Sequence, residues 1–313
     1  MTSSAVKDIY WGEFPESELD IVLRHMRAGD MNSARAYIEE KTKRTDFIFG
    51  SARSDFLYYT SHEPETHCLD IGCGLGVHTF NMARYAHSVT AFDLSAKRAE
   101  FCNLRAQLTG VTNISCTHDS LKTFDPKGKT FNTIIMNGIL EWVPEDRVHK
   151  DPRMDQLDAL RKVKSLMSKD GMLYVGIENR FALNYLTSAR DHNHLRYTSF
   201  MPRFLASLIT KILCGKPYRT YTYSAWGYKK LFRDAGFSPA HTELYIAHPG
   251  YNLPKYLIPF EDISALRFFI DGLMEGKGVR GSIIRFLARS NIFLRMIRHG
   301  FYSYAIFAKN SHD

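Results

Sequence analysis

The sequence predicts an α/β protein built on a doubly wound parallel sheet. Short apolar segments alternate with segments of helical periodicity between residues 67 and 177. A glycine-rich turn follows the first apolar segment, and polar or acidic residues follow the later ones. Because ligands collect at the carboxyl ends of parallel strands, these residues predict a binding site along one edge of the sheet.

The glycine-rich turn lies in residues 67–80, which read HCLDIGCGLGVHTF. Gly72, Gly74 and Gly76 alternate between a predicted strand and a predicted helix over 77–86. Glycine permits positive φ and close approach of a ligand to the backbone. A dinucleotide site would need a glycine where Val77 stands, and the carboxylate of Asp70 would repel a diphosphate. The turn therefore favours a ligand with a cationic amino group, with a purely structural turn as the alternative.

Three further predicted strands each end in polar residues. The strand over 87–92 ends at Asp93, about 20 residues past the glycines, where a carboxylate reaches a ribose. As an alternative, Asp93 or Ser95 caps the helix predicted over 95–108. The strands over 113–117 and 131–136 lead into Asp119 and Asn137. With Asp70 on the first strand, four polar positions thus lie at or near strand ends, in order.

In these four positions the chain resembles the class I methyltransferases that use S-adenosylmethionine. The resemblance implies a Rossmann-like seven-stranded sheet whose closing strands form an antiparallel pair. It also implies S-adenosylmethionine as the cofactor and a set of cofactor-binding residues: Asp70, Gly72, Cys73, Gly74, Gly76, Asp93, Leu94, Asp119, Ser120 and Asn137.

The remaining pattern predicts additions to this scaffold. Helices over 17–29 and 33–43, and a third over 51–60, predict an N-terminal helical arm or lid in residues 1–60, ahead of a methyltransferase domain in 61–313. The alternation continues with a helix over 154–167 and a strand over 172–177, and resumes with a helix over 223–235 and strands over 240–247 and 302–308. Two substrate-side insertions are expected, at about 181–222 and 248–300.

The acceptor of the methyl group decides which further residues matter. A hydroxyl acceptor needs a base to take its proton, and an amine needs only to arrive neutral. His192 and His194 are the leading candidates for the base, with Glu178 and Glu141 as secondary candidates. The alternative for the histidines is a solvated polar loop.

A set of short motifs resembles a bacterial branch of methyltransferases associated with cell-surface glycans and other glycosylated products. The resemblance covers about residues 65–260. It implies a sugar hydroxyl as the acceptor, with His192 as the base and Asp191 as the residue that orients it. The chain differs from the branch at Ala182, where a glycine is common. The motifs are IENR at 177–180, DH at 191–192, TYTYS at 220–224, DAGF at 234–237 and PGYNLP at 249–254. Methylation of a nitrogen or carboxylate on a natural product, or a non-catalytic cofactor-binding module, are the alternatives.

The sequence lacks the motifs of two other kinds of methyltransferase. Asn137 is followed by Gly138 and Ile139, so the (N/D)-P-P-(Y/F) motif of adenine and glutamine N-methylation is missing. No cluster of carboxylates stands at the predicted strand ends to hold a divalent ion, and we expect no metal.

Composition bears on compartment and partners. The five cysteines have no C-x-x-C spacing, which favours small core residues over disulfides, and the chain has neither a signal-peptide pattern nor a long apolar run. We therefore expect a cytoplasmic protein. A net charge of +8 permits acidic partners. No nucleic-acid-binding module is recognisable in the sequence, so we do not expect the protein to bind nucleic acid. A basic amphipathic helix predicted over 279–300 either contacts the inner face of a membrane or packs on the sheet with its arginines outward.

Overall fold

The computed structural model describes residues 14–311 except 61, 62, 64, 147 and 188. The first 13 residues of the predicted arm and the start of the predicted methyltransferase domain at 61 lie outside this part. The chain forms two compact units. Unit 1 comprises Met1–Met136, Lys162–Leu173 and Asn310–Asp313, and unit 2 comprises Asn137–Arg161 and Tyr174–Lys309.

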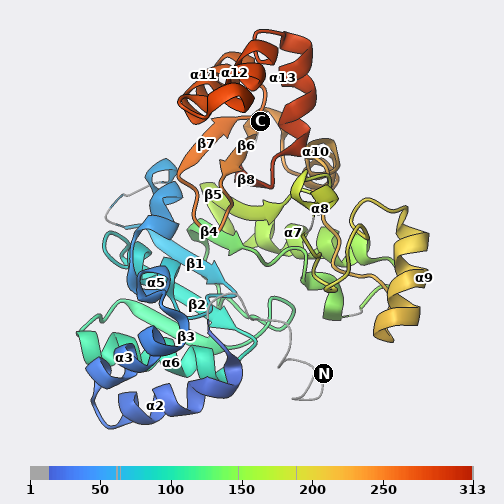
Figure 1. The fold of residues 1–313 in the computed structure, drawn as a ribbon. Helices are drawn as coiled ribbons and strands as arrows, with labels where there is room; N and C mark the ends of the chain where they lie inside the picture. Colours follow the sequence, from blue (N-terminus) through green and yellow to red (C-terminus); the bar gives the residue numbers. More distant parts are fainter. Residues whose placement is uncertain (1–13, 61–62, 64, 147, 188, 312–313) are drawn as a thin grey trace. The chain divides into compact units, whose positions relative to one another are not determined.

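Unit 1 contains the parallel part of the sheet (Figure 1). Strand β1 (His67–Ile71) lies between β2 (Ser88–Asp93) and β4 (Phe131–Asn137), and β3 (Ile114–His118) pairs with the other side of β2. In this register Ile71 lies opposite Phe92, and Asp93 lies opposite His118. The carboxyl ends of these strands therefore lie together, as the sequence predicted.

Helices α5 (Val77–Met82) and α6 (Ala96–Thr109) connect these strands. The N-terminal residues form η1 (Glu16–Glu18), α2 (Leu19–Arg27), α3 (Met31–Thr42), α4 (Thr45–Phe49) and the 3₁₀ segment η2 (Ala52–Tyr59). Leu23 and Met26 of α2 belong to one buried apolar cluster with Leu75 of the glycine turn and Phe101 of α6. The arm thus contributes to the core beside the glycine turn, where burial of apolar surface stabilises both.

Unit 2 contains the antiparallel strands. Strand β6 (Thr242–His248) pairs antiparallel with β8 (Ser303–Lys309), which confirms the expected closing pair, and on its other side with β7 (Tyr256–Pro259). Strand β5 (Met167–Glu178) contributes residues to both units. The strand order is β3-β2-β1-β4-β5-β8-β6-β7, so the sheet has eight strands where seven were predicted. The additional strand is β7, a short edge strand inside the second predicted insertion.

The helices of the second half are α7 (Pro152–Leu166), α8 (Asn184–Thr187), α9 (Arg203–Cys214), α10 (Ala225–Asp234), α11 (Ile263–Met274), α12 (Gly278–Leu287) and α13 (Asn291–Ile297), with 3₁₀ turns η3 (Val143–Asp146), η4 (Pro239–His241) and η5 (Arg298–Gly300). The single helix predicted over 279–300 is therefore wrong. Ser290 accepts a hydrogen bond from the N–H of Phe293 and begins a new helix. Within the described residues, no helix has the length and apolar character needed to span a bilayer.

Candidate active site

The glycine turn has the conformation that its residues predicted. Gly72, Gly74 and Gly76 have φ values of 71°, 55° and 81°, all in the left-handed region that side chains disfavour. At Gly76 a Cβ atom would lie 2.9 Å from Sγ of Cys102 and 3.1 Å from the ring of Phe80. Glycine is needed here both for the backbone conformation and for the space.

Asp93 fastens the glycine turn to β2. Its Oδ2 accepts a hydrogen bond from the N–H of Gly74 at 2.9 Å, and its Oδ1 accepts one from the N–H of Ser95 at 2.8 Å. The carboxylate is buried, and burial raises its pKa above the ordinary value. The N-cap of α6 is Ser95, whose side chain accepts from the N–H of Arg98. Because each carboxylate oxygen can accept a second hydrogen bond, Asp93 can also receive a ribose hydroxyl.

The other two predicted carboxylates lie at the carboxyl ends of β1 and β3: Asp70 is the last residue but one of β1, and Asp119 follows β3 directly. Asp70 is buried, and its Oδ2 accepts a hydrogen bond from the hydroxyl of Thr79 at 2.6 Å. Asp119 is half-buried, and its Oδ1 accepts from the N–H of Ser120 at 2.8 Å. With Asp93, the last residue of β2, three acceptors thus lie at the carboxyl ends of three neighbouring strands. S-Adenosylmethionine presents three matching donors: an ammonium, a ribose diol and an adenine amino group. The acceptors of the site therefore fit the donors of this cofactor.

Two further predicted cofactor residues differ in setting. Leu94 is half-buried and follows β2 directly. Asn137 ends β4 within unit 2, where a Cβ on Gly176 of β5 would lie 2.1 Å from its Oδ1. Glycine at 176 therefore makes room for the Asn137 side chain. The next residue, Gly138, donates its N–H to the carbonyl of Gly176 at 2.8 Å.

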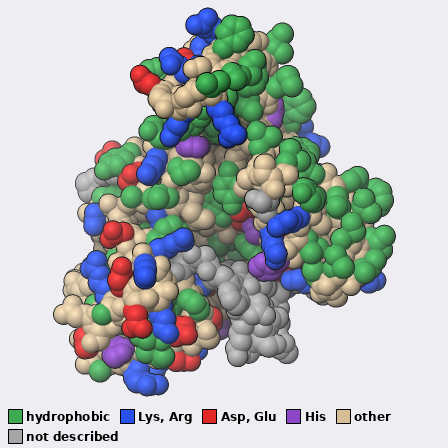
Figure 2. Space-filling model, in the orientation of Figure 1, with side chains coloured by type: hydrophobic (Ala, Val, Ile, Leu, Met, Phe, Trp, Pro, Cys, Tyr) green, Lys and Arg blue, Asp and Glu red, His purple; other side chains and the backbone are tan. Residues whose placement is uncertain are grey.

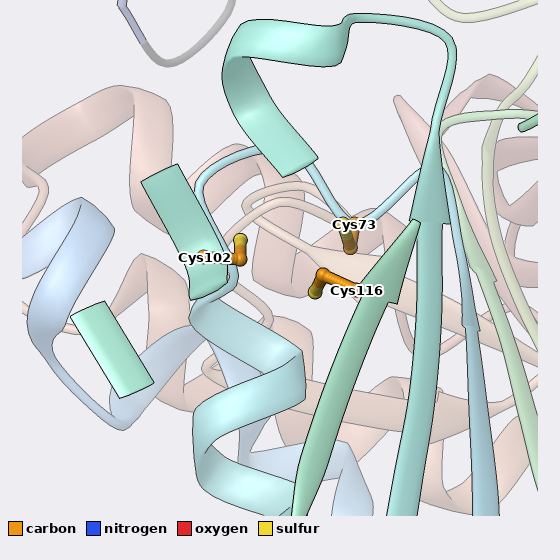
Figure 3. A group of neighbouring side chains, drawn as sticks. All are labelled: Cys73, Cys102 and Cys116. Atoms are coloured by element: carbon orange, nitrogen blue, oxygen red, sulfur yellow. The ribbon is translucent and has the colours of Figure 1, made fainter. Parts of the chain in front are cut away.

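Three cysteines converge beside the glycine turn, which the sequence did not predict. Cys73 comes from the turn, Cys102 from α6 and Cys116 from β3, and their sulfur atoms all lie within 4.8 Å of one another (Figure 3). All three are buried. Hydrogen bonding among the thiols, together with burial, raises the pKa of Cys73 and of Cys116. The thiols of Cys73 and Cys116 are therefore protonated at neutral pH, and the three side chains pack as small buried groups.

A second polar cluster lies within unit 2 and joins three residues far apart in the sequence. Glu141 follows β4, Glu178 ends β5, and His192 lies in the loop between α8 and α9. The Nε2 atom of His192 is 3.5 Å from Oε2 of Glu178 and 3.8 Å from Oε1 of Glu141. The imidazole also meets the ring of Trp142 edge-on, with centroids 4.8 Å apart. We call Glu141, Glu178 and His192 the acid–histidine cluster.

Glu178 is held in place by tyrosines. Its Oε1 accepts a hydrogen bond from the hydroxyl of Tyr302 at 2.8 Å, and its Oε2 accepts one from the hydroxyl of Tyr185. Its backbone carbonyl accepts from the hydroxyl of Tyr228 at 2.8 Å. These bonds fix the carboxylate that faces His192, so the histidine meets an oriented negative charge.

Glu141 is the least satisfied group of the cluster. Its side chain is fully buried, and neither carboxylate oxygen has a hydrogen-bond partner among the described residues. Burial raises the pKa of Glu141 to about 7, Glu178 raises it further and His192 opposes the shift. Near neutral pH the group can therefore either donate or accept a proton.

Two other predicted residues, Asp191 and His194, lie in the same loop as His192 but are not members of the acid–histidine cluster. The Oδ1 of Asp191 accepts hydrogen bonds from the N–H groups of Asn193 at 2.9 Å and Leu195 at 3.3 Å, and its Oδ2 accepts from the hydroxyl of Thr198. The Asp191 carboxylate thus closes its own loop. His194 is exposed, with a left-handed φ of 60°. Among the residues that the structure describes, the carboxylates within 4 Å of Nε2 of His192 belong to Glu141 and Glu178.

Sequence reasoning named Glu141, Glu178 and His192 but not the residues that surround them. Tyr302 lies 124 residues after Glu178 and bonds to it only because β8 and β5 are brought together. Tyr185 lies seven residues after Glu178 and is the bonding partner nearest to it in the sequence.

Residues 68–170, one third of the chain, match the family model described as "Methyltransferase domain". This match supports S-adenosylmethionine as the cofactor and a methyltransferase as the class of enzyme. It identifies neither the acceptor nor the branch of the family. None of the curated proteins matches the chain.

Several solved structures are distantly similar. The [4+2]-cyclase SpnF is 14% identical, with a TM-score of 0.48, over 87% of this chain and 82% of its own. A putative sarcosine dimethylglycine methyltransferase from Galdieria sulphuraria is 12% identical, with a TM-score of 0.47, over 88% of each chain. A putative methyltransferase from Bacillus halodurans is 10% identical, with a TM-score of 0.45, over 84% of this chain and 100% of its own. These similarities are too distant to bear on the acceptor.

Proposed function

We propose that the protein is an S-adenosylmethionine-dependent O-methyltransferase whose acceptor is a hydroxyl, with His192 as the base. The observation that carries the proposal is the acid–histidine cluster, in which His192 faces Glu178 at 3.5 Å and Glu178 is bound by two tyrosine hydroxyls. A histidine oriented by a fixed carboxylate is the usual arrangement of a general base for a hydroxyl.

The chemistry divides between the cofactor and the chain. S-Adenosylmethionine, when bound, supplies an electrophilic methyl group on a sulfonium. Nε2 of His192 faces the glutamates, so this nitrogen carries the proton and Nδ1 accepts the proton of the acceptor hydroxyl. Glu178 then stabilises the imidazolium. Trp142, packed against the imidazole, limits its rotation.

We further propose that the acceptor hydroxyl belongs to a sugar, on the resemblance of the IENR, DH and PGYNLP motifs to glycan-associated methyltransferases. Asp191 remains a proposed positioning residue for His192, acting through the loop that its carboxylate closes. The five free cysteines are in keeping with a cytoplasmic reaction.

A second candidate is methylation of an amine. Two buried carboxylates, Glu141 and Glu178, lie with the ring of Trp142 near one histidine, and carboxylates with aromatic rings also suit an ammonium group. An amine would need to lose its proton before transfer, but it would not need His192 to act as a base in the transition state.

The experiment is methyl transfer from labelled S-adenosylmethionine to a panel of free sugars, glycosides and lipid-linked sugars, by wild type, His192→Gln and His194→Gln. His194 is the matched control because it is exposed and lies in the same loop. We expect His192→Gln to lower kcat by about 100-fold or more with cofactor affinity unchanged, and His194→Gln to retain activity. A fully active His192→Gln enzyme would refute the assignment of His192 as the base. A flat pH profile on an amine acceptor would favour the second candidate. Cofactor binding with no transfer to any acceptor would favour a non-catalytic module.

A further inference from the structure

Helices α12 and α13 carry large apolar side chains on their exposed surface. Val279, Ile283 and Phe286 of α12 follow the spacing of one helix face and are 77%, 54% and 67% exposed. Ile292 and Met296 of α13 are four residues apart and are 74% and 71% exposed. With the exposed Leu287, these six residues form what we call the α12–α13 face. Contiguous exposed apolar patches mark sites of interaction on soluble proteins.

The rest of unit 2 holds this face outward. The buried residues of the two helices are Gly281 and Leu294, so the apolar stripe of α12 is not the side that packs. Arg267 of α11 donates to the carbonyl of Ala288 at 3.1 Å and to the side chain of Asn291, which fixes the turn between the helices. The arrangement expected for a surface helix, with apolar side chains inward, is therefore reversed on α12.

Positive charge surrounds the face. The sequence from 276 to 312 contains no aspartate or glutamate. Five exposed cations lie in or beside the two helices: Lys277, Arg280, Arg285, Arg289 and Arg295. Of these, Arg285 lies 3.7 Å from Asp271, and the other four have no ion-pair partner within the described part of the chain. Figure 2 shows hydrophobic and basic side chains together over α11, α12 and α13.

We propose that the α12–α13 face binds the surface of an anionic lipid bilayer. Apolar side chains enter the boundary between headgroups and acyl chains, while arginines at the same level meet lipid phosphates. A second copy of the chain is disfavoured because it would bring the same positive charge to the contact. Nucleic acid would satisfy the arginines but would leave the aliphatic side chains without a role.

The test is co-sedimentation of the full chain with vesicles of equimolar phosphatidylglycerol and phosphatidylcholine, compared with vesicles of phosphatidylcholine alone. We expect the protein to bind the anionic vesicles. Binding should weaken as the salt concentration is raised above 0.1 M, where the Debye length is about 10 Å, because added salt screens the attraction. Arg280→Gln with Arg295→Gln should weaken binding about 30-fold, at about fivefold for each cation lost. Ile283→Ser with Phe286→Ser should weaken it by about tenfold or more.

Helix α9 supplies the matched control. Phe204 and Ile212 are 78% and 71% exposed on one face of α9, where the exposed cation is Lys211. The variant Phe204→Ser with Ile212→Ser should bind vesicles like wild type. Equal loss in the α9 and α12 variants would overturn the assignment, as would absence of vesicle binding or binding that is indifferent to anionic lipid. Thermal unfolding and titration with S-adenosylhomocysteine check that each variant is folded. The proposal does not depend on the acceptor, since its readout is vesicle binding without turnover.

Discussion

Replacement of Glu141 by glutamine tests the electrostatics of the acid–histidine cluster. The folded-state pKa of Glu141 is raised from 4.5 to about 7, chiefly by burial. A carboxyl group with a raised folded-state pKa contributes stability that is fully present below its unfolded pKa and is lost as pH rises through the folded value. At 1.36 kcal/mol per pKa unit the whole loss is about 3 kcal/mol, and about 2.5 kcal/mol of it falls between pH 5 and pH 8.

The assay is urea unfolding of wild type and Glu141→Gln at pH 5 and pH 8, followed by tryptophan fluorescence. Two of the three tryptophans of the chain, Trp142 and Trp226, belong to unit 2, so most of the signal reports on the unit that holds the cluster. Wild type should lose about 2.5 kcal/mol more stability than the variant over this interval. Glutamine is neutral at both pH values, so any cost of burying it is the same at each. Glu243→Gln, at an exposed position of β6, is the control and should behave as wild type. Identical pH dependence in wild type and Glu141→Gln would refute the reasoning.

Three predictions concern unit 1 and the cysteines. Gly76→Ala should lower the free energy of unfolding by about 1 to 3 kcal/mol, because its φ is 81° and the new Cβ would meet Cys102 at 2.9 Å; unchanged urea unfolding would contradict this. Asp93→Ala should weaken binding of S-adenosylhomocysteine, measured by calorimetry, while circular dichroism shows a folded protein; unchanged affinity would remove its ribose role. The exposed Cys214 should react rapidly with a thiol reagent, and the other four cysteines should react only on unfolding. Several fast-reacting thiols in the folded protein would contradict this, because they would show that the buried cysteines are accessible.

The parallel half of the fold was predictable because its signals are local. Glycines in the 72–76 turn and polar residues after each strand punctuate short apolar runs, and the observed strands β1 to β4 lie within two residues of the predicted bounds. Helix α6 also matches, because Ser95 caps its beginning and Gly110 adopts the left-handed conformation at its end.

The antiparallel half was less predictable because pairing decides its structure. Strand β7 has four residues, ends at Pro259 and exists as an edge strand through its pairing with β6. The turn between α12 and α13 had a local signal, the serine N-cap at Ser290, which the apolar and basic periodicity obscured.

The candidate site divides in the same way. The carboxylates Asp70, Asp93 and Asp119 lie at or next to strand ends and could be named from spacing alone. The surroundings of Glu178 could not, because Tyr302 reaches it from the residue that precedes β8, near the end of the chain. The convergence of Cys73, Cys102 and Cys116 likewise depends on the register of β2 with β3 and on the packing of α6.

The measurement that tests the central claim most directly is calorimetric titration of the full chain with S-adenosylhomocysteine and, separately, with NAD⁺. Three carboxylates at the carboxyl ends of β1, β2 and β3 suit the ammonium, ribose and adenine amino groups of the first ligand. Asp70 beside the glycine turn would repel the diphosphate of the second. We expect micromolar binding of S-adenosylhomocysteine and none of NAD⁺. Binding of NAD⁺, or a folded protein that does not bind S-adenosylhomocysteine, would contradict it.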